Sequence, residues 1–275
     1  MKNILIIAAK EIQEGMRNRW VLATTLLLAA LALTLSFLGS APTGNVGVDP
    51  LDIVVVSLSS LTIFLVPLIA LVLSHDAIVG EMERGTMLLL LSYPIGRRQV
   101  IFGKFLGHLA ILSFATLFGY GAAALALAIT GTAISSDSLL AFAAMIGSSV
   151  LLGAVFIAIG YLISTLAAER STAGGIAIGI WLFFVLIYDM ALLGGLVVAQ
   201  GKPLPSGLLD LLLVVNPTDA YRLLNLGSGN ASALSGMGGL AGQTALSPLI
   251  LLLALLVWII APLTLATTLF SRREL

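Results

Sequence analysis

Residues 248–273 read PLILLLALLVWIIAPLTLATTLFSRR, and this stretch decides the fold class of the chain. It carries no charged side chain before Arg272, and the whole interval between Arg222 and Arg272 holds 49 uncharged residues. A helix that crosses a bilayer needs about 20 consecutive apolar residues. The stretch therefore predicts a transmembrane helix over 248–270 that ends at a pair of arginines.

Uncharged gaps of similar length recur along the rest of the chain. Four of them hold 29, 23, 32 and 31 residues, and an 18-residue gap after Arg170 continues beyond Asp189 as an apolar run to Ala199. Each gap is long enough for one crossing. We therefore predict an all-α polytopic membrane protein with six transmembrane helices, over residues 20–39, 53–73, 105–130, 139–167, 172–197 and 248–270.

The composition agrees with this fold class and excludes several classes of function. Hydrophobic residues make up 59% and charged residues 9% of the chain, with a mean hydropathy of +1.13, whereas about a quarter of a soluble domain is charged. A soluble enzyme and a disordered protein are excluded, and a net charge of zero leaves no electrostatic footprint for nucleic acid. Without cysteine there is no disulfide, thiolate metal site or redox pair. We expect a single membrane domain over residues 1–275.

Lys and Arg are divided unevenly between the two ends of the predicted helices. Eleven fall on the side that carries both chain termini, and only Lys202 and Arg222 fall on the other. Because positive residues concentrate in cytoplasmic loops, both termini are predicted to be cytoplasmic. The first predicted span is too long for the apolar core of a signal peptide, so we expect it to remain in the protein.

The N-terminal residues 1–19 show an amphipathic pattern. Lysines, glutamates and an arginine accompany apolar residues that recur at helical spacing, namely Leu5, Ala8, Ile12 and Met16. This pattern predicts an amphipathic helix that lies on the inner leaflet of the membrane. A plain cytoplasmic flank is the alternative.

The long link before the last span, residues 200–247, contains two short helical patterns. An apolar run over 206–215 ends at Asn216-Pro217, which is a typical start for a second helix because asparagine caps and proline suits the first turn. Both helices are too short to cross a membrane. We expect them to form a helical hairpin at the outer surface, followed by a flexible loop over 227–245.

Residues 76–92, between the second and third predicted spans, form the most informative polar stretch. Acidic and basic side chains stand close together there, at Asp76, Glu81, Glu83 and Arg84, ahead of a short leucine run. A short helix along the membrane surface could present Glu81, Glu83 and Arg84 to a soluble partner. A solvated loop with a Glu81–Arg84 pair at i,i+3 spacing is the alternative, and the residues alone leave both open.

The residues that could carry chemistry do not form a recognisable catalytic or nucleotide site. His75, Asp76 and the nearby glutamates lack the spacing of metal ligands on one helical face, and His108 stands alone in the third span. We expect no catalytic residue and no metal site, with an intramembrane enzyme that uses His75, Asp76 or His108 as an alternative. The run from Gly96 to Lys104 lacks the spacing of a phosphate-binding loop, so energy from ATP must come from another subunit.

Two features of the fifth predicted span favour structural roles. Asp189 is ionisable, and such residues inside a membrane are candidates for function, but its place near the outer end favours a structural role. Gly175 and Gly179 form a GxxxG step, which allows a second helix to approach closely. The step does not say which helix is the neighbour.

The segment from Gly80 to Thr86, Gly-Glu-Met-Glu-Arg-Gly-Thr, resembles the first cytoplasmic loop of ABC-2 type permeases, as do Tyr93-Pro94 and Arg97-Arg98 after it. In that family an E-x-E-x-G-T segment forms the coupling helix that docks on a separate ATPase subunit. The resemblance implies that ATPase docking falls to Asp76, Gly80, Glu81, Glu83, Arg84, Gly85 and Thr86, with Glu169 and Arg170 as a second contact.

The same resemblance implies a set of partners and a location. It implies a multi-pass permease of the bacterial inner membrane that associates with a second copy of itself and with membrane lipid, and with no nucleic acid. This chain would hold no cofactor, because ATP and Mg would be bound by the ATPase subunit.

Within the family, three stretches are similar to the permeases that serve copper-site assembly in nitrous-oxide reductase. They are the segment from Lys10-Glu11 to Arg19-Trp20, the cytoplasmic loop described above and the run from Asn216 to Arg222. This closer likeness implies a periplasmic protein partner. The outer hairpin is the predicted contact surface, through Asp210, Asn216, Asp219 and Arg222.

The sequence offers few soft ligands for a copper path. Within the predicted spans they are Met145, Met190 and His108, and copper(I) prefers several soft ligands together. We therefore expect the permease to transfer motion to the periplasmic protein, or to export a sulfur species, rather than to conduct copper. Export of another small substrate is the alternative.

Overall fold

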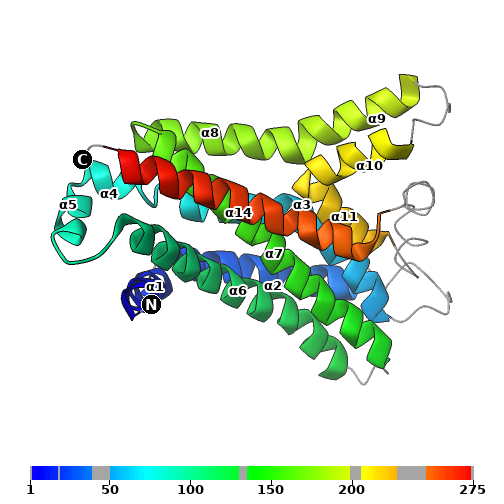
Figure 1. The fold of residues 1–275 in the computed structure, drawn as a ribbon. Coiled ribbons are helices and arrows are strands. Elements are labelled where there is room, and N and C mark those ends of the chain that lie inside the picture. The colour runs from blue at the N-terminus through cyan, green and yellow to red at the C-terminus, as the bar shows by residue number, and fades with distance from the viewer. Residues whose placement is uncertain are drawn as a thin grey trace.

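The computed structural model describes residues 2–17, 19–38, 50–129, 135–198, 206–227 and 246–273. Every regular element within these ranges is a helix, and Figure 1 shows their arrangement. The helices are α1 (Lys2–Arg17), α2 (Arg19–Leu38), α3 (Pro50–Ser74), α4 (Val79–Glu83), α5 (Thr86–Leu91), α6 (Arg97–Ile129), α7 (Ser136–Leu166), α8 (Arg170–Leu182), the π-helical turn η1 (Phe183–Ile187), α9 (Tyr188–Val198), α10 (Ser206–Val215), α11 (Pro217–Leu226) and α14 (Pro248–Arg272).

The membrane fold predicted from the charge gaps is confirmed. Five helical segments of the described chain are long and apolar enough to cross a bilayer, and α1 and α2, bent by 68° at their junction, make a sixth if the pair is counted as one span. The start of the third span was placed wrongly, at residue 105. The helix α6 begins at Arg97, because its first two turns pack beneath α1 outside the apolar stretch.

The helix α7 is the most buried of the candidate spans. It packs against α3, α14 and α6. The approach to α3 is close at Gly160, where a Cβ atom would lie 1.9 Å from Ser74 Oγ. A larger residue at this position would force the two helices apart.

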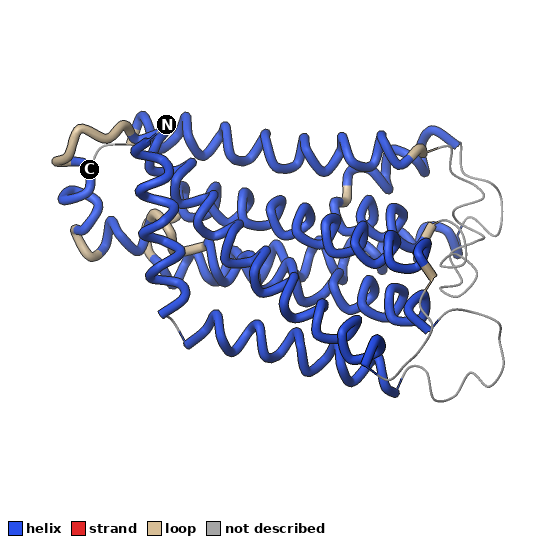
Figure 2. Tube along the Cα trace, turned by 90° about the horizontal axis from the view of Figure 1, so that it is seen from below, coloured by secondary structure: helices blue, strands red, loops and turns tan. Residues whose placement is uncertain are grey.

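The two ends of the bundle differ in content. One end, here called the charged end, holds α1, α4, α5, the start of α6, the turn between α7 and α8 and the end of α14, and the N and C labels lie there (Figure 1). Figure 2 shows α1 lying across the ends of the spans rather than along them. The opposite end, here called the hairpin end, holds α10 and α11 (Figure 1).

The predicted hairpin helices are present as α10 and α11. Asn216 caps α11 by accepting a hydrogen bond from Thr218 N at 3.0 Å, and Pro217 occupies the first turn as expected. The loop predicted after them lies, from residue 228 to 245, outside the described residues.

The fifth span is interrupted where the sequence predicted one continuous helix. Its π-helical turn η1 leaves the carbonyl oxygen of Phe184 able to accept from Asn216 Nδ2 at 3.1 Å and from Thr218 Oγ1 at 3.2 Å. A π-bulge of this kind shifts the backbone hydrogen-bond pattern locally. Here it ties the broken span to the start of α11.

Candidate functional site at the charged end

The site begins with the close packing of α1 on α6. A Cβ atom at Gly103 would lie 2.7 Å from Ile7 Cβ, and one at Gly107 would lie 2.5 Å from Glu11 Cβ. Both distances are too short for non-bonded carbons, so only glycine allows α1 to lie this close. As a result Ile7, Ala8 and Glu11 are buried, while Leu5 and Met16 of the predicted apolar face stay exposed.

Lys104 is buried at the centre of this packing. Its Nζ donates to Glu11 Oε1 at 2.8 Å and lies 2.7 Å from Glu81 Oε1. Both glutamates are only 8% exposed. One ammonium therefore joins α1, α6 and α4, three elements that are distant in the sequence.

Glu11 is held in its charged form by these neighbours. Burial by itself would raise the pKa of its carboxyl, but the nearby charges, of which the ammonium of Lys104 is the foremost, together outweigh burial and leave the pKa below its ordinary value. His108 and Lys10 lower the pKa in the same direction. The carboxylate on α1 therefore stays ionised at neutral pH.

A second polar chain extends from Glu11 into α7. His108 Nε2 lies 3.5 Å from Glu11 Oε2, and Tyr161 OH lies 3.0 Å from His108 Nδ1. Both His108 and Tyr161 are buried. His108 is thus a packed partner in the network, and His75, whose Nδ1 faces the carbonyl oxygens of Leu71 and Val72, lies elsewhere.

The predicted coupling segment folds as two short helices rather than one. Gly85 separates α4 from α5 with a φ of +70°, a conformation that glycine adopts without strain. The backbone N–H groups of Ile78 and Val79 donate to Ser164 Oγ at 2.9 and 3.1 Å, which fixes the start of α4 to α7.

The two polar contacts predicted separately are brought together. Arg170 donates from its guanidinium to Asp76 Oδ2 at 2.8 Å, and its backbone N–H donates to Glu83 Oε1 at 2.7 Å. The turn after α7, which also holds Glu169, therefore lies against the segment around α4.

The carboxylate of Glu81 does not lie where the sequence predicted it. Glu81 was expected to face a soluble partner or to pair with Arg84, but its carboxylate is buried and pairs with Lys104, because the short α4 turns it toward α6. Glu83, Arg84, Thr86 and Ser92 are exposed polar side chains of the segment. Among the described residues, Arg84 forms no ion pair.

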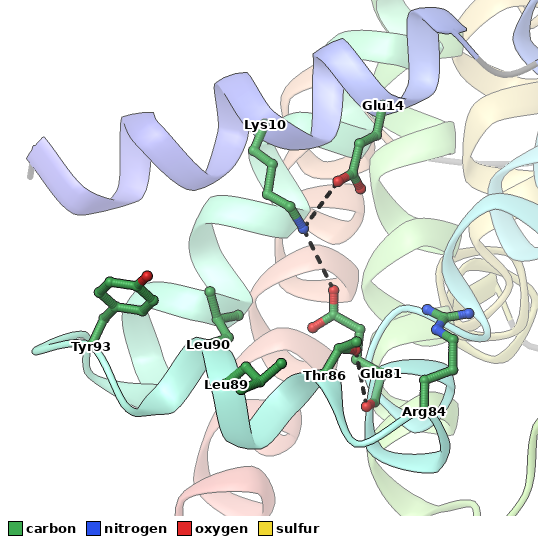
Figure 3. Close-up of a pocket in the computed structure, with 8 residues that line it drawn as sticks. All are labelled: Lys10, Glu14, Glu81, Arg84, Thr86, Leu89, Leu90 and Tyr93. Atoms are coloured by element: carbon green, nitrogen blue, oxygen red, sulfur yellow. Dashed lines mark hydrogen bonds and ion pairs between the residues drawn. The ribbon is translucent and has the colours of Figure 1, made fainter.

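A cavity of about 410 Å³ opens between α1 and the two short helices. Figure 3 shows the side chains that line it: Lys10, Glu14, Glu81, Arg84, Thr86, Leu89, Leu90 and Tyr93. Lys10 Nζ lies 3.3 Å from Glu14 Oε1 and 3.9 Å from Glu81 Oε1, so it bridges the two carboxylates across the opening. The cavity combines a polar side with a wall of leucines and a tyrosine.

The C-terminal arginines close the charged end. Arg273 donates to the carbonyl oxygens of Thr165 at 2.5 Å and Ala167 at 3.0 Å, which satisfies acceptors at the end of α7. Arg97 donates to the carbonyl oxygens of Phe270 at 2.9 Å and Arg273 at 2.5 Å. Three spans, α6, α7 and α14, are thereby tied together at this end.

The polar residues predicted on the outer hairpin face inward instead. Asp219 is 1% exposed and Asn216 is fully buried, and Arg222 pairs with both Asp219 and Asp189. Burial raises the pKa of Asp219 to about 7, against the opposing charge of Arg222 and with a further rise from Asp189. Asp189 is thus an ion-pair partner of Arg222.

Asp210 is the one remaining predicted contact of the hairpin. It is partly buried, and its Oδ1 has no hydrogen-bond partner within the described chain. None of the four predicted hairpin residues is thus fully exposed, so a partner at this end would meet other side chains of the hairpin, such as the exposed Leu208 and Leu211.

Several residues of the site were missed by sequence reasoning. Lys104, Glu11 and Ser164 were not singled out, because their partners lie between 23 and 93 positions away and no local pattern marks them. The only signal was their residue type, since buried lysines and glutamates need partners. In the described part of the chain, no group of three or more His, Asp and Glu side chains could hold a metal ion.

Comparison with known proteins identifies the class to which this architecture belongs. The family model of ABC-2 family transporter proteins matches residues 5–275, and the chain belongs to that family. It is a multi-pass membrane protein and the permease subunit of a transporter.

Two curated relatives are similar over their full lengths. One, from Pseudomonas aeruginosa, is named as a probable ABC transporter permease protein NosY and is 50% identical over 276 residues, covering 100% of both chains. The other, from Stutzerimonas stutzeri, carries the same name and is 46% identical over 278 residues, covering 99% of each chain.

Proposed function

We propose that this chain is the inner-membrane subunit of an ATP-driven complex in which a separate ABC ATPase docks at the charged end. That end would face the cytoplasm, with both termini inside, and ATP and Mg would be bound by the ATPase. The uneven distribution of Lys and Arg supports this orientation.

The observation that carries the proposal is the attachment of the coupling segment to the spans. The segment continues α3, its backbone is held by Ser164 of α7, Glu81 pairs with Lys104 of α6, and Arg170 at the start of α8 holds Asp76. A force applied to the exposed Glu83 and Arg84 would therefore reach four spans. An ordinary solvated loop would not need such anchoring.

The same helices lead to the opposite end. The hairpin helix α11 packs against α3, α7 and α14. Tyr221 OH lies 3.0 Å from Ser149 Oγ, and Ser148 Oγ donates to Asn225 Oδ1 at 3.0 Å. A shift of α3 or α7 at the charged end would therefore move the hairpin, and this supports transfer of motion across the membrane.

The process served by this motion is proposed from the relatives. Both carry the name NosY, and the likeness of this chain to permeases of copper-site assembly in nitrous-oxide reductase points the same way. We propose that the hairpin end acts on a periplasmic partner protein during that assembly. Export of another small substrate remains the second candidate, because ABC-2 family membership alone is equally consistent with it.

The positions of the soft ligands support motion transfer or export of a sulfur species over copper conduction. Met145 is fully buried in α7, Met190 of α9 is 73% exposed, and His108 bonds with Tyr161 at the charged end. These three side chains lie in different surroundings and do not follow one another along a path. A copper path needs soft ligands in succession.

A second copy of the chain is part of the proposal. The fifth span is the least buried of the candidate spans, and Gly175 and Gly179 of its GxxxG step have no atom of the described chain within 4 Å of an added Cβ. Small residues on an uncovered helix face allow close approach by another helix.

The test of this function is copper loading of nitrous-oxide reductase in cells that lack the chain and carry a plasmid copy. We expect the wild-type copy to restore the copper content, and a variant with Met145→Leu, Met190→Leu and His108→Gln to restore it as well. Loss of loading in the triple variant, with normal assembly and ATP hydrolysis, would favour copper conduction. Normal loading without any copy of the chain would refute the proposed process.

A further inference from the structure

The cavity between α1 and the short helices has a polar atom that its own chain leaves unsatisfied. Glu81 lines the cavity, and its Oε2 is buried without a hydrogen-bond partner among the described residues. A buried carboxylate oxygen without a partner is costly. In Figure 3 the carboxylate lies between Lys10 and the leucine side of the cavity.

The buried charges next to this atom are one positive charge short. Glu11 and Glu81 are both buried, and Lys104 is the one buried cation of the described chain that pairs with them. Lys10 is half exposed and lies 3.3 Å from Glu14 Oε1, against 3.8 Å from Glu11 Oε1 and 3.9 Å from Glu81 Oε1. These three carboxylates therefore share two ammonium groups, and a further cation that enters the cavity would meet the unpartnered Oε2 of Glu81.

The walls of the cavity can hold the aliphatic part of a lysine or arginine side chain. Leu89, Leu90 and Tyr93 line one side, and lysine and arginine side chains bury their aliphatic stems along apolar surface while the charged head finds a polar partner. The tyrosine ring can add a cation–π contact. Arg84 at the rim, which forms no ion pair within the described chain, would favour a partner surface with an acidic residue beside the basic one.

We propose that this cavity is a socket for a lysine or arginine side chain of the ATPase subunit, with Glu81 as the carboxylate that receives it. The inference rests on the proposed function, since it specifies how the ATPase docks at the charged end. It also gives α1 a part in docking, because α1 supplies Lys10 and Glu14 to the socket.

The test compares Glu81 with Glu11, two glutamates that both pair with Lys104. Glu81→Gln and Glu11→Gln each remove a carboxylate that pairs with Lys104, at 2.7 and 2.8 Å, but only Glu81 lines the cavity. Affinity for the purified ATPase subunit is measured with the permease in lipid nanodiscs. We expect Glu81→Gln to weaken binding by about tenfold or more, and Glu11→Gln to weaken it much less.

The chain has no cysteine, so Leu89→Cys provides a single thiol on the cavity wall for a photoreactive cross-linker, and Leu88→Cys on the same helix is the control outside the cavity. We expect Leu89→Cys to capture an ATPase peptide that contains a lysine or arginine. Replacement of that residue by alanine should weaken binding as much as Glu81→Gln does, and the two changes together should cost no more than either alone.

Four results would overturn the socket while leaving ATPase docking intact. Glu81→Gln could lose as much affinity as Glu11→Gln, or it could bind the ATPase as the wild type does. The losses of affinity from the permease change and the ATPase change could be additive when the two are combined. Finally, the cross-link could depend on phosphatidylethanolamine in the nanodisc and capture no ATPase peptide, since the occupant would then be a lipid amine. Failure of the wild-type chain to bind the ATPase at all would instead refute the proposed function.

Discussion

Lys104 Nζ lies 2.7 Å from Glu81 Oε1, and this pair of buried side chains joins the coupling segment to the third span. The two residues are 23 positions apart and belong to different helices. Because Lys104 also holds Glu11 of α1, the surface that faces a docking partner and the helix that lies across the bundle are fixed by the same ammonium.

Replacement of Lys104 by methionine should destabilise the charged end. The change leaves Glu11 and Glu81 buried with only the half-exposed Lys10, at 3.8 and 3.9 Å, as a cation near them, and loss of one partner from a buried ion pair costs about 3–5 kcal/mol. We expect a clear fall in the thermal unfolding midpoint of the solubilised protein. Lys10→Met, which removes a half-exposed lysine from the same cluster, should change stability by about 1 kcal/mol or less. Equal effects of the two changes would show that the buried position of Lys104 is unimportant.

Gly107→Ala tests the close packing of α1 on α6. The added Cβ would lie 2.5 Å from Glu11 Cβ, which is fixed on the α1 backbone, so the helices must separate at a cost of about 1–3 kcal/mol. The control is Gly121→Ala on the same helix, where nothing lies within 4 Å of the added atom. We expect that control to be neutral or slightly stabilising in the same thermal unfolding measurement. A neutral Gly107→Ala would mean that α1 does not lie against α6 in the membrane.

Gly85→Ala tests the turn between α4 and α5. At a φ of +70° an alanine is strained by about 1–2 kcal/mol, and the strain can be relieved only by changing the angle between the two short helices. We expect weaker binding of the ATPase with little change in the melting of the spans. Gly96→Ala, at a nearby glycine that also has open space around an added Cβ but no left-handed backbone, should leave binding unchanged.

Asp219 should make the hairpin end sensitive to pH. Burial raises its pKa from 3.8 to about 7, so between these values the folded protein binds more protons than the unfolded chain and its stability falls as pH rises. The thermal unfolding midpoint is compared between the wild type and Asp219→Asn across pH 4 to 8. We expect the wild type to lose stability relative to the variant as pH rises through this window. A constant difference would show that Asp219 stays charged, paired with Arg222.

The sequence predicts the spans well because lipid imposes a simple rule on them. A crossing needs an uncharged run of sufficient length, and this rule found the five candidate spans of the described chain, the apolar helix α2 and the non-spanning pair α10 and α11. The cap at Asn216-Pro217 was also predictable, since its chemistry is local. By contrast, the start of α6 was misplaced because the uncharged run marks only the part of a helix inside the membrane, and a helix can extend beyond it through charged residues.

The candidate site was less predictable because its contacts are not local. The sequence marked Glu81 as a charge but could not tell that α4 is too short to keep it at the surface. It also placed Asp219 on the outside, since Asp189, which pairs with the same Arg222, lies 30 positions away on a span broken by a π-helical turn. Both errors concern the direction in which a side chain points, which depends on packing between helices.

The most direct test of the central claim is the rate of ATP hydrolysis by the companion ATPase in membranes that contain the complex. Arg84→Glu reverses an exposed charge in the coupling segment, and Arg98→Glu reverses an exposed charge at the same end outside it. We predict that Arg84→Glu releases the ATPase during affinity purification and removes the influence of the permease on hydrolysis, while Arg98→Glu behaves as the wild type. An ATPase that co-purifies and hydrolyses ATP normally with Arg84→Glu, or that never associates with the wild-type chain, would contradict the account.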